Sequence, residues 1–228
     1  MDDAVSELTA SVIGDRLGAI RDRIRRAGGD DGVVVVGVTK GHPASTVRAA
    51  ISAGIDQVGE SYAQEWAAKF AELGDLVSGP SVVRHFIGQL QTNKVRLVAP
   101  IVDLFQTVDR PSLVDALAAR APGARVMVQV DLAGAPGRGG VAFESAPALV
   151  ARATDAGLVV DGLMGVAPIP DPDDRAASRR GFERLRSLRD ELGLRSLSIG
   201  MSDDLEEAVA AGSTMVRIGT GLFGPRSA

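Results

Sequence analysis

Cysteine is absent from the 228-residue chain, and histidine, the other common soft metal ligand, is scarce. Without cysteine there is no disulfide, no thiol nucleophile and no thiolate ligand for a metal. Histidine occurs only as His42 and His85, so the sequence does not predict a classical metal site. The lack of cysteine also agrees with a reducing compartment, although it does not require one.

The sequence also lacks an excess of positive charge and any long apolar run. It has 25 basic and 29 acidic residues, a net charge of −4, so neither nucleic acid nor an anionic membrane surface is an expected partner. No stretch approaches the roughly 18 apolar residues of a membrane span. The N-terminal segment MDDAVSEL carries acidic residues where a secretory signal carries basic ones. We therefore expect a cytoplasmic protein.

What the sequence does contain is a regular series of strand-like segments. A helix predicted over residues 4–27 comes first and ends at a pair of glycines. The strand-like segments follow at a mean spacing of about 26 residues, enough for a strand, a helix and two short loops. They cover residues 33–39, 57–60, 84–88, 104–109, 126–132, 160–166, 197–201 and 215–220.

Helical patterns fill the intervals between these segments, at residues 43–53, 61–72, 91–99, 111–120, 145–156, 173–192 and 203–211. Regular alternation of this kind predicts a parallel sheet covered by helices. Eight units favour closure into a (β/α)8 barrel over an open doubly wound sheet. Few residues follow the last strand, so the N-terminal helix is predicted to cover the face that an eighth helix would occupy. No linker divides the chain, and we expect one domain over residues 1–228.

Lys40 ends the first predicted strand, in the segment VVGVTKGHP. A charged ammonium is poorly solvated at the end of an apolar run, which favours the neutral amine. A neutral lysine is the nucleophile that forms a Schiff base with an aldehyde. In the alternative interpretation Lys40 simply extends from the strand end into solvent.

The last strand contains Arg217 and leads into Gly219, Thr220 and a further glycine. The loops after strands seven and eight of a barrel often bind phosphate through backbone N–H groups and a hydroxyl. A glycine-containing turn with no ligand is the alternative interpretation of this segment.

The seventh strand ends in Ser202-Asp203-Asp204, just before a predicted helix. The Ser202 hydroxyl and the first amides of that helix are further candidate donors to an anion. The alternative is structural, because Asp203 and Glu206 have the spacing of a capping box.

His85 lies on the third strand, before a polar segment that begins at Gly88. Its two interpretations are a site residue and a hydrogen-bonded structural histidine. Tyr62 and Trp66 are the only tyrosine and tryptophan, and their spacing of four favours packing of Trp66 in the core.

In a barrel, Lys40 and the phosphate donors would share one end, and strands one and eight would be neighbours. An aldehyde that carries a phosphate satisfies both features. Pyridoxal 5′-phosphate (PLP) is such a molecule, and Arg217 would then face its pyridine nitrogen. An aldolase-like enzyme that acts on a sugar phosphate through Lys40 is the alternative without this cofactor.

The residues that carry this pattern resemble the YggS/PROSC family of pyridoxal phosphate homeostasis proteins, also called PLP-binding proteins (PLPBP). The resemblance extends from about residue 33 to residue 224. It rests on VTKGHP around Lys40, GESYAQE at 59–65, HFIGQLQTNK at 85–94, TVDR at 107–110, GLMGV at 162–166 and SIGMSDDLEEAVAAGSTMVRIGTGLFG at 198–224. The last stretch is the most specific.

The resemblance implies a single barrel of the alanine racemase N-terminal type, the PLP fold type III, in which Lys40 forms the Schiff base. It implies that Arg217 faces the pyridine nitrogen and that the phosphate lies at the C-terminal loops. The implied cofactor-binding residues are Lys40, Ser61, His85, Met164, Ser202, Arg217, Gly219 and Thr220. Because arginine stays protonated, the pyridine nitrogen beside it should stay unprotonated, which makes the ring a poorer electron sink.

Three positions depart from the family pattern. Ser61 replaces the usual asparagine after Gly-Glu, and His42 replaces a second lysine that commonly follows the first. Arg138 stands where a lysine usually precedes the glycines of the loop after the fifth strand. These differences concern secondary contacts and cofactor exchange more than Lys40 itself.

The resemblance implies a protein of PLP homeostasis, which holds PLP as a Schiff base on Lys40 and supplies it to PLP-dependent apoenzymes. We expect a monomer, because no long exposed apolar element in the sequence indicates a partner subunit. The alternative is a PLP-dependent amino-acid racemase of the same barrel type. A two-base racemase needs an acid or base on the face opposite the lysine. Tyr62, His42 and His85 are the side chains considered for that role.

Overall fold

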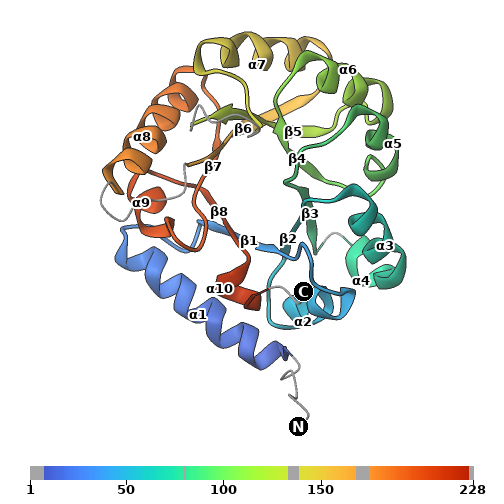
Figure 1. Ribbon diagram of the computed structural model, residues 1–228, viewed down its shortest axis with the longest axis vertical. Coiled ribbons are helices and arrows are strands. Elements are labelled where there is room, and N and C mark those ends of the chain that lie inside the picture. The colour runs from blue at the N-terminus through green and yellow to red at the C-terminus, as the bar shows by residue number, and fades with distance from the viewer. Residues whose placement is uncertain (1–7, 80, 133–138, 168–174, 226–228) are drawn as a thin grey trace.

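Eight parallel strands close into a barrel in the order in which they follow one another along the chain, and helices form a ring outside them (Figure 1). The computed structural model describes residues 8–79, 81–132, 139–167 and 175–225. The strands are β1 (Val34–Val38), β2 (Gln57–Glu60), β3 (Val83–Phe86), β4 (Leu104–Val108), β5 (Arg125–Asp131), β6 (Val159–Val166), β7 (Ser196–Ser198) and β8 (Met215–Ile218). The predicted (β/α)8 barrel is confirmed, and the open doubly wound sheet is excluded.

The barrel closes between its first and last strands. Val36 of β1 is aligned with Arg217 of β8, and on the other side Gly37 of β1 is aligned with Val58 of β2. A parallel sheet of this kind is covered by helices, which explains why β1 is a continuous apolar run, Val34–Val38, that is almost entirely buried. All strands point the same way, so the segments after β1, β7 and β8 meet at one end of the barrel.

The helices of the outer ring occupy the predicted intervals. They are α2 (Ala44–Ser52), α3 (Ala63–Leu73), α5 (Val95–Val98), α6 (Pro111–Arg120), α7 (Ala146–Asp155), α8 (Arg175–Glu191) and α9 (Leu205–Ala210). The helix predicted over 91–99 is divided into the 3-10 turn η1 (Thr92–Lys94) and α5. The sequence did not indicate the 3-10 turn η2 (Phe143–Ser145) or the short helices α4 (Asp75–Ser78) and α10 (Thr220–Phe223).

The N-terminal helix α1 (Ala10–Arg26) completes the ring, as predicted, although it begins later than the predicted range 4–27, of which residues 4–7 lie outside the described residues. It packs against α2, α9 and α10, the last of which is the short helix that follows β8 (Figure 1). Ile13, Ile20 and Ile24 are buried on its inner face. Because α10 has only four residues, α1 covers the side of the barrel that a full eighth helix would cover.

The buried side chains form two groups. The larger group lies between the strands and the helices and contains Trp66, whose side chain is fully buried. The smaller group includes Val36, Leu104, Met127 and Met164. Within the described residues, no helix has the length and apolar character needed to cross a membrane, and no cluster of acidic and histidine side chains suits a metal ion.

Candidate functional site

Lys40 lies two residues after the end of β1, in a turn at the carboxyl end of the strand, and is half-buried. The preceding residue, Thr39, is fully buried. The following residue, Gly41, has a φ of 73°, in the left-handed region that glycine adopts without strain. The strand thus delivers Lys40 to the end of the barrel, beside the exit of β8.

A buried group of charges lies against this turn. The Lys69 ammonium on α3 donates hydrogen bonds to the Thr39 carbonyl oxygen at 2.7 Å and to Glu60 Oε2 at 2.5 Å. A third hydrogen bond goes to Glu65 Oε1 at 2.6 Å, so all three ammonium donors are used. The same Glu65 oxygen accepts a hydrogen bond from the backbone N–H of Gly41 at 2.7 Å.

Glu60 ends β2, and its side chain is fully buried. Burial raises the pKa of Glu60, and the neighbouring Lys69 ammonium only partly opposes that effect. Glu60 Oε1 accepts a hydrogen bond from the N–H of Ser61 at 3.0 Å, so the charge group also holds the segment that follows β2. These charges were not predicted from the sequence, although Glu65 and Lys69 have the helical i, i+4 spacing of an ion pair.

Arg217 lies on β8 with its side chain directed to neighbouring strands, and only 5% of it is exposed. Its guanidinium donates hydrogen bonds to the carbonyl oxygen of Ser198 at 2.8 Å, to Ser198 Oγ at 2.7 Å and to the carbonyl oxygen of Gly165 at 2.9 Å. Burial lowers the pKa of Arg217 to about 10, so the group is still charged at neutral pH. In the described part of the chain, Arg217 forms no ion pair with a carboxylate.

A chain of hydrogen bonds continues from Arg217 across four more strands. Ser198 Oγ donates to Gln106 Oε1 at 2.7 Å, and Gln106 Nε2 contacts His85 Nδ1 at 2.8 Å. His85 Nε2 in turn lies 2.8 Å from Gln57 Oε1. The directions are mutually consistent if Nδ1 accepts and Nε2–H donates, which makes His85 a neutral imidazole. Burial lowers the pKa of His85 to about 3, in agreement with that form.

The two C-terminal loops predicted to hold a phosphate are directly connected. Ser202 Oγ accepts a hydrogen bond from the backbone N–H of Gly221 at 3.2 Å. A Cβ on Gly221 would lie 3.2 Å from that oxygen and 3.0 Å from Ile218 Cγ2, so glycine permits this close approach. Gly219 precedes the first turn of α10, and Thr220 is exposed at its start.

The capping box predicted for Asp203 and Glu206 is wrong. Helix α9 begins at Leu205 after Asp204, whose carboxylate accepts a hydrogen bond from the N–H of Met201 at 2.5 Å and does not cap the helix. Glu206 instead forms a bidentate ion pair with Arg23 of α1, at 2.6 and 2.8 Å. The spacing of Asp203 and Glu206 along the chain does not reveal that Arg23, on a distant helix, binds the Glu206 carboxylate. Arg23 also donates to the carbonyl oxygen of Ser202, at 3.0 Å.

The other residues singled out from the sequence occupy different places, and Arg138 lies outside the described residues. Met164 is 2% exposed, in the smaller interior group. The His42 ring lies 5.7 Å from the Phe223 ring, centroid to centroid. Trp66 is in the core as predicted, whereas Tyr62, one turn before it, is 56% exposed.

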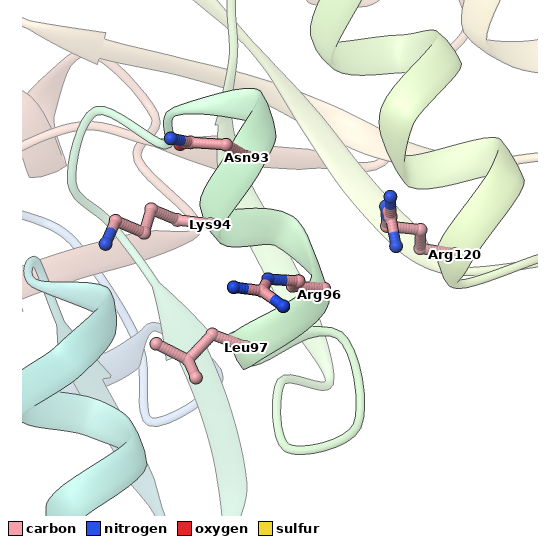
Figure 2. Close-up of a pocket in the computed structure, with 5 residues that line it drawn as sticks. All are labelled: Asn93, Lys94, Arg96, Leu97 and Arg120. Carbon is pink, nitrogen blue, oxygen red and sulfur yellow. The ribbon is translucent and has the colours of Figure 1, made fainter.

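A separate hollow of about 420 Å³ lies on the outer helices. Figure 2 shows Asn93, Lys94, Arg96 and Leu97 projecting from η1 and α5, and Arg120 from the end of α6. Three of these side chains are cationic. The hollow belongs to the helical ring rather than to the turn that carries Lys40.

Comparisons with known proteins agree with this fold. Residues 16–227 match the family model of the alanine racemase N-terminal domain. The chain is 41% identical over 215 residues to a pyridoxal phosphate homeostasis protein of Pseudomonas aeruginosa, covering 91% of each chain. It is 38% identical over 234 residues to the Escherichia coli K12 protein of the same name, covering 94% of this chain and 97% of that one.

A solved structure is similar over nearly the same extent. PipY of Synechococcus elongatus PCC7942, determined with PLP bound, superposes with a TM-score of 0.78 at 31% identity. The match covers 93% of this chain and 100% of PipY.

Proposed function

This chain belongs to the family of pyridoxal phosphate homeostasis proteins, and we propose that it holds PLP as a Schiff base on Lys40 and supplies it to apoenzymes. In forming the Schiff base, the Lys40 amine nitrogen bonds to the aldehyde carbon of PLP, and the aldehyde oxygen leaves as water. PLP supplies the reactive aldehyde, while the protein supplies the amine and the groups that orient it.

The assignment to Lys40 rests on the different positions and hydrogen bonds of the three lysines. The Lys69 ammonium uses all its donors on two carboxylates and a carbonyl oxygen, so it has no lone pair for an aldehyde. Lys94 lines the outer hollow of the helical ring. Lys40 alone of the three follows a barrel strand at its carboxyl end, where sites of this fold are built.

The surrounding residues fit the other parts of PLP. The contact between Ser202 and Gly221 joins the loops after β7 and β8, and with Gly219 and Thr220 it offers a hydroxyl and backbone amides to a phosphate. Arg217 stays charged and forms no direct ion pair with a carboxylate within the described residues, so it can donate to an unprotonated pyridine nitrogen.

Three further contacts are part of the proposal. Met164 belongs to the interior group, Ser61 is held next to Glu60, and His85 reaches Arg217 through Gln106 and Ser198. Because both ring nitrogens of His85 already have partners, we place its influence on PLP through that hydrogen-bond chain.

Lys40→Ala, with Lys94→Ala as the matched control, tests the Schiff base. The wild-type protein and the control, incubated with PLP, should show a visible imine absorbance that borohydride removes, and Lys40→Ala should show none. An imine band that persists in Lys40→Ala would reject the assignment.

Supply to apoenzymes is tested by mixing the loaded protein with an apo PLP-dependent enzyme and following the recovery of that enzyme's activity. Recovery that exceeds that given by the free PLP present supports a carrier. Sustained racemisation of an added amino acid by the loaded protein would instead favour the racemase alternative.

We also propose that one domain spans residues 1–228, that the protein is monomeric and that it acts in the cytoplasm. The monomer is checked by light scattering after size-exclusion chromatography, where a mass near 23.6 kDa is expected. A mass of twice that value would show a dimer.

A further inference from the structure

The buried charges of α3 and β2 contact the backbone on both sides of Lys40. On one side the Thr39 carbonyl accepts a hydrogen bond from Lys69, and on the other the Gly41 N–H donates to Glu65. Glu65 and Lys69 form an ion pair with each other and lie one turn apart on α3. The two peptide groups that flank Lys40 are therefore attached to one helix.

We propose that Glu65 and Lys69 are positioning residues, which hold the turn around Lys40 in the conformation that accepts PLP. The proposal rests on the proposed function of Lys40. Neither residue touches PLP in this account, because both act through the backbone of Thr39 and Gly41.

The turn needs such support because of its composition. Gly41 is exposed and adopts a φ of 73°, and glycine has access to many other conformations. If only a fraction of the molecules had the turn in its binding form, the apparent affinity for PLP would fall by that fraction. The hydrogen bond from Gly41 to the Glu65 carboxylate selects one form before PLP arrives.

The buried charges around Lys69 are better explained by the directional hydrogen bonds that they make to the backbone than by a gain in stability. Lys69 is 5% exposed and Glu60 is fully buried, and a buried ion pair often contributes no more stability than apolar side chains of similar size. Apolar side chains would not donate to the Thr39 carbonyl or accept from the Gly41 N–H. The charges therefore provide hydrogen bonds that a purely apolar contact between α3 and β1 would lack.

The same charges also reach Ser61. Glu60 accepts hydrogen bonds from Lys69 and, through its other oxygen, from the Ser61 N–H. One buried group thus fixes the backbone at two of the proposed PLP contacts, Lys40 and Ser61.

Glu65→Ala is the most direct test, because it removes the acceptor of Gly41 while the buried Lys69–Glu60 pair remains. Glu72→Ala is the matched control, since Glu72 is an exposed glutamate on the same helix. Glu65→Gln is the conservative variant, because its amide oxygen still accepts from Gly41. Three quantities are measured for each full-length variant: amide hydrogen exchange at Gly41 without PLP, PLP affinity by absorbance titration, and the rate of imine formation.

We expect Glu65→Ala to speed exchange at Gly41 and to weaken PLP binding about tenfold, the loss of one charge-assisted hydrogen bond. Glu65→Gln should restore affinity to within about twofold of the wild type, and Glu72→Ala should match the wild type. Unchanged affinity and imine rate in Glu65→Ala would overturn the inference, as would equal losses in Glu72→Ala. A wild-type protein without an imine on Lys40 would instead overturn the proposed function, and the Gly41 exchange result would still test the contact.

Discussion

Arg217 is a positive charge that the barrel buries next to neutral partners. Its acceptors are the carbonyl oxygens of Ser198 and Gly165 and the Ser198 hydroxyl, and its pKa falls to about 10 because of burial. The charge of the buried Asp204 carboxylate opposes this shift only in part, and Arg217 forms no ion pair with a carboxylate among the described residues. A buried charge without an ion-pair partner is costly for stability. We therefore interpret Arg217 as a residue kept for its effect on PLP rather than for the stability of the barrel.

Arg217→Met tests that interpretation. The free energy of unfolding without PLP should stay within about 1 kcal/mol of the wild type, or rise, because relief from burying the charge offsets the lost hydrogen bonds. The PLP absorbance spectrum should change, because the pyridine nitrogen loses its donor. Denaturant unfolding and absorbance titration measure the two effects. A loss of about 3–5 kcal/mol, as when one partner of a buried ion pair is removed, would contradict the interpretation.

His85 makes the stability of the barrel depend on pH. Its pKa is about 3 in the folded protein and about 6.5 in an unfolded chain, so below pH 6.5 the unfolded state binds the extra proton. The stability that comes from neutral His85 is complete above pH 6.5 and is lost as the pH falls toward 3. The expected slope is about 1.4 kcal/mol per pH unit, or about 2 kcal/mol at pH 5.

Denaturant unfolding between pH 7 and pH 4.5 checks this slope, with His85→Gln as the control. The glutamine can accept from Gln106 and donate to Gln57 but does not titrate, so its stability should fall less steeply. Parallel pH curves for the two proteins would show that His85 is not the cause.

Helix α1, at the start of the chain, packs against the helices at its end, which its position in the sequence does not reveal. It lies before the first strand, yet it packs beside α9 and α10, which are close to the end of the chain (Figure 1). Arg23 reinforces this contact through its ion pair with Glu206 and its hydrogen bond to the Ser202 carbonyl oxygen. Helix α1 therefore also supports the loop proposed to bind phosphate.

Ile24→Ala should reveal how much the barrel depends on α1. Ile24 is fully buried, and truncating such a side chain costs about 2–5 kcal/mol, whereas Val12→Ala, at a 38% exposed position of the same helix, should cost far less. Denaturant unfolding of the two variants measures the difference. Equal, small losses would show that α1 is not part of the cooperative core.

On the scale of the whole molecule, the alternation of strands and helices was predictable because strand-like segments recur at a regular spacing with helical patterns between them, and the clearest of the strands, β1, is an apolar, β-branched run. VVVVGVT predicted β1 to within a residue, and the eight repeats predicted the barrel. The short helices α4 and α10 were not predicted because four residues are too few to show a helical period.

The candidate site was predictable where a residue type is unusual for its place, as with a lysine at a strand end and an arginine within an apolar strand. Contacts between distant segments were not predictable, because spacing along the chain does not reveal them. Glu206 pairs with Arg23 across the molecule, and Lys69 reaches Thr39 from another element. His85 likewise acquires its partners, Gln57 and Gln106, only when β2, β3 and β4 are side by side.

Of the three lysines, Lys40 is the one proposed to hold PLP. The measurement that decides this is to incubate the wild-type protein with PLP, reduce it with borohydride and locate the added mass by peptide mapping. We expect one phosphopyridoxyl group per chain, on the peptide that contains Lys40. Modification of Lys69 or Lys94 in its place, or of no lysine at all, would show that Lys40 does not hold PLP.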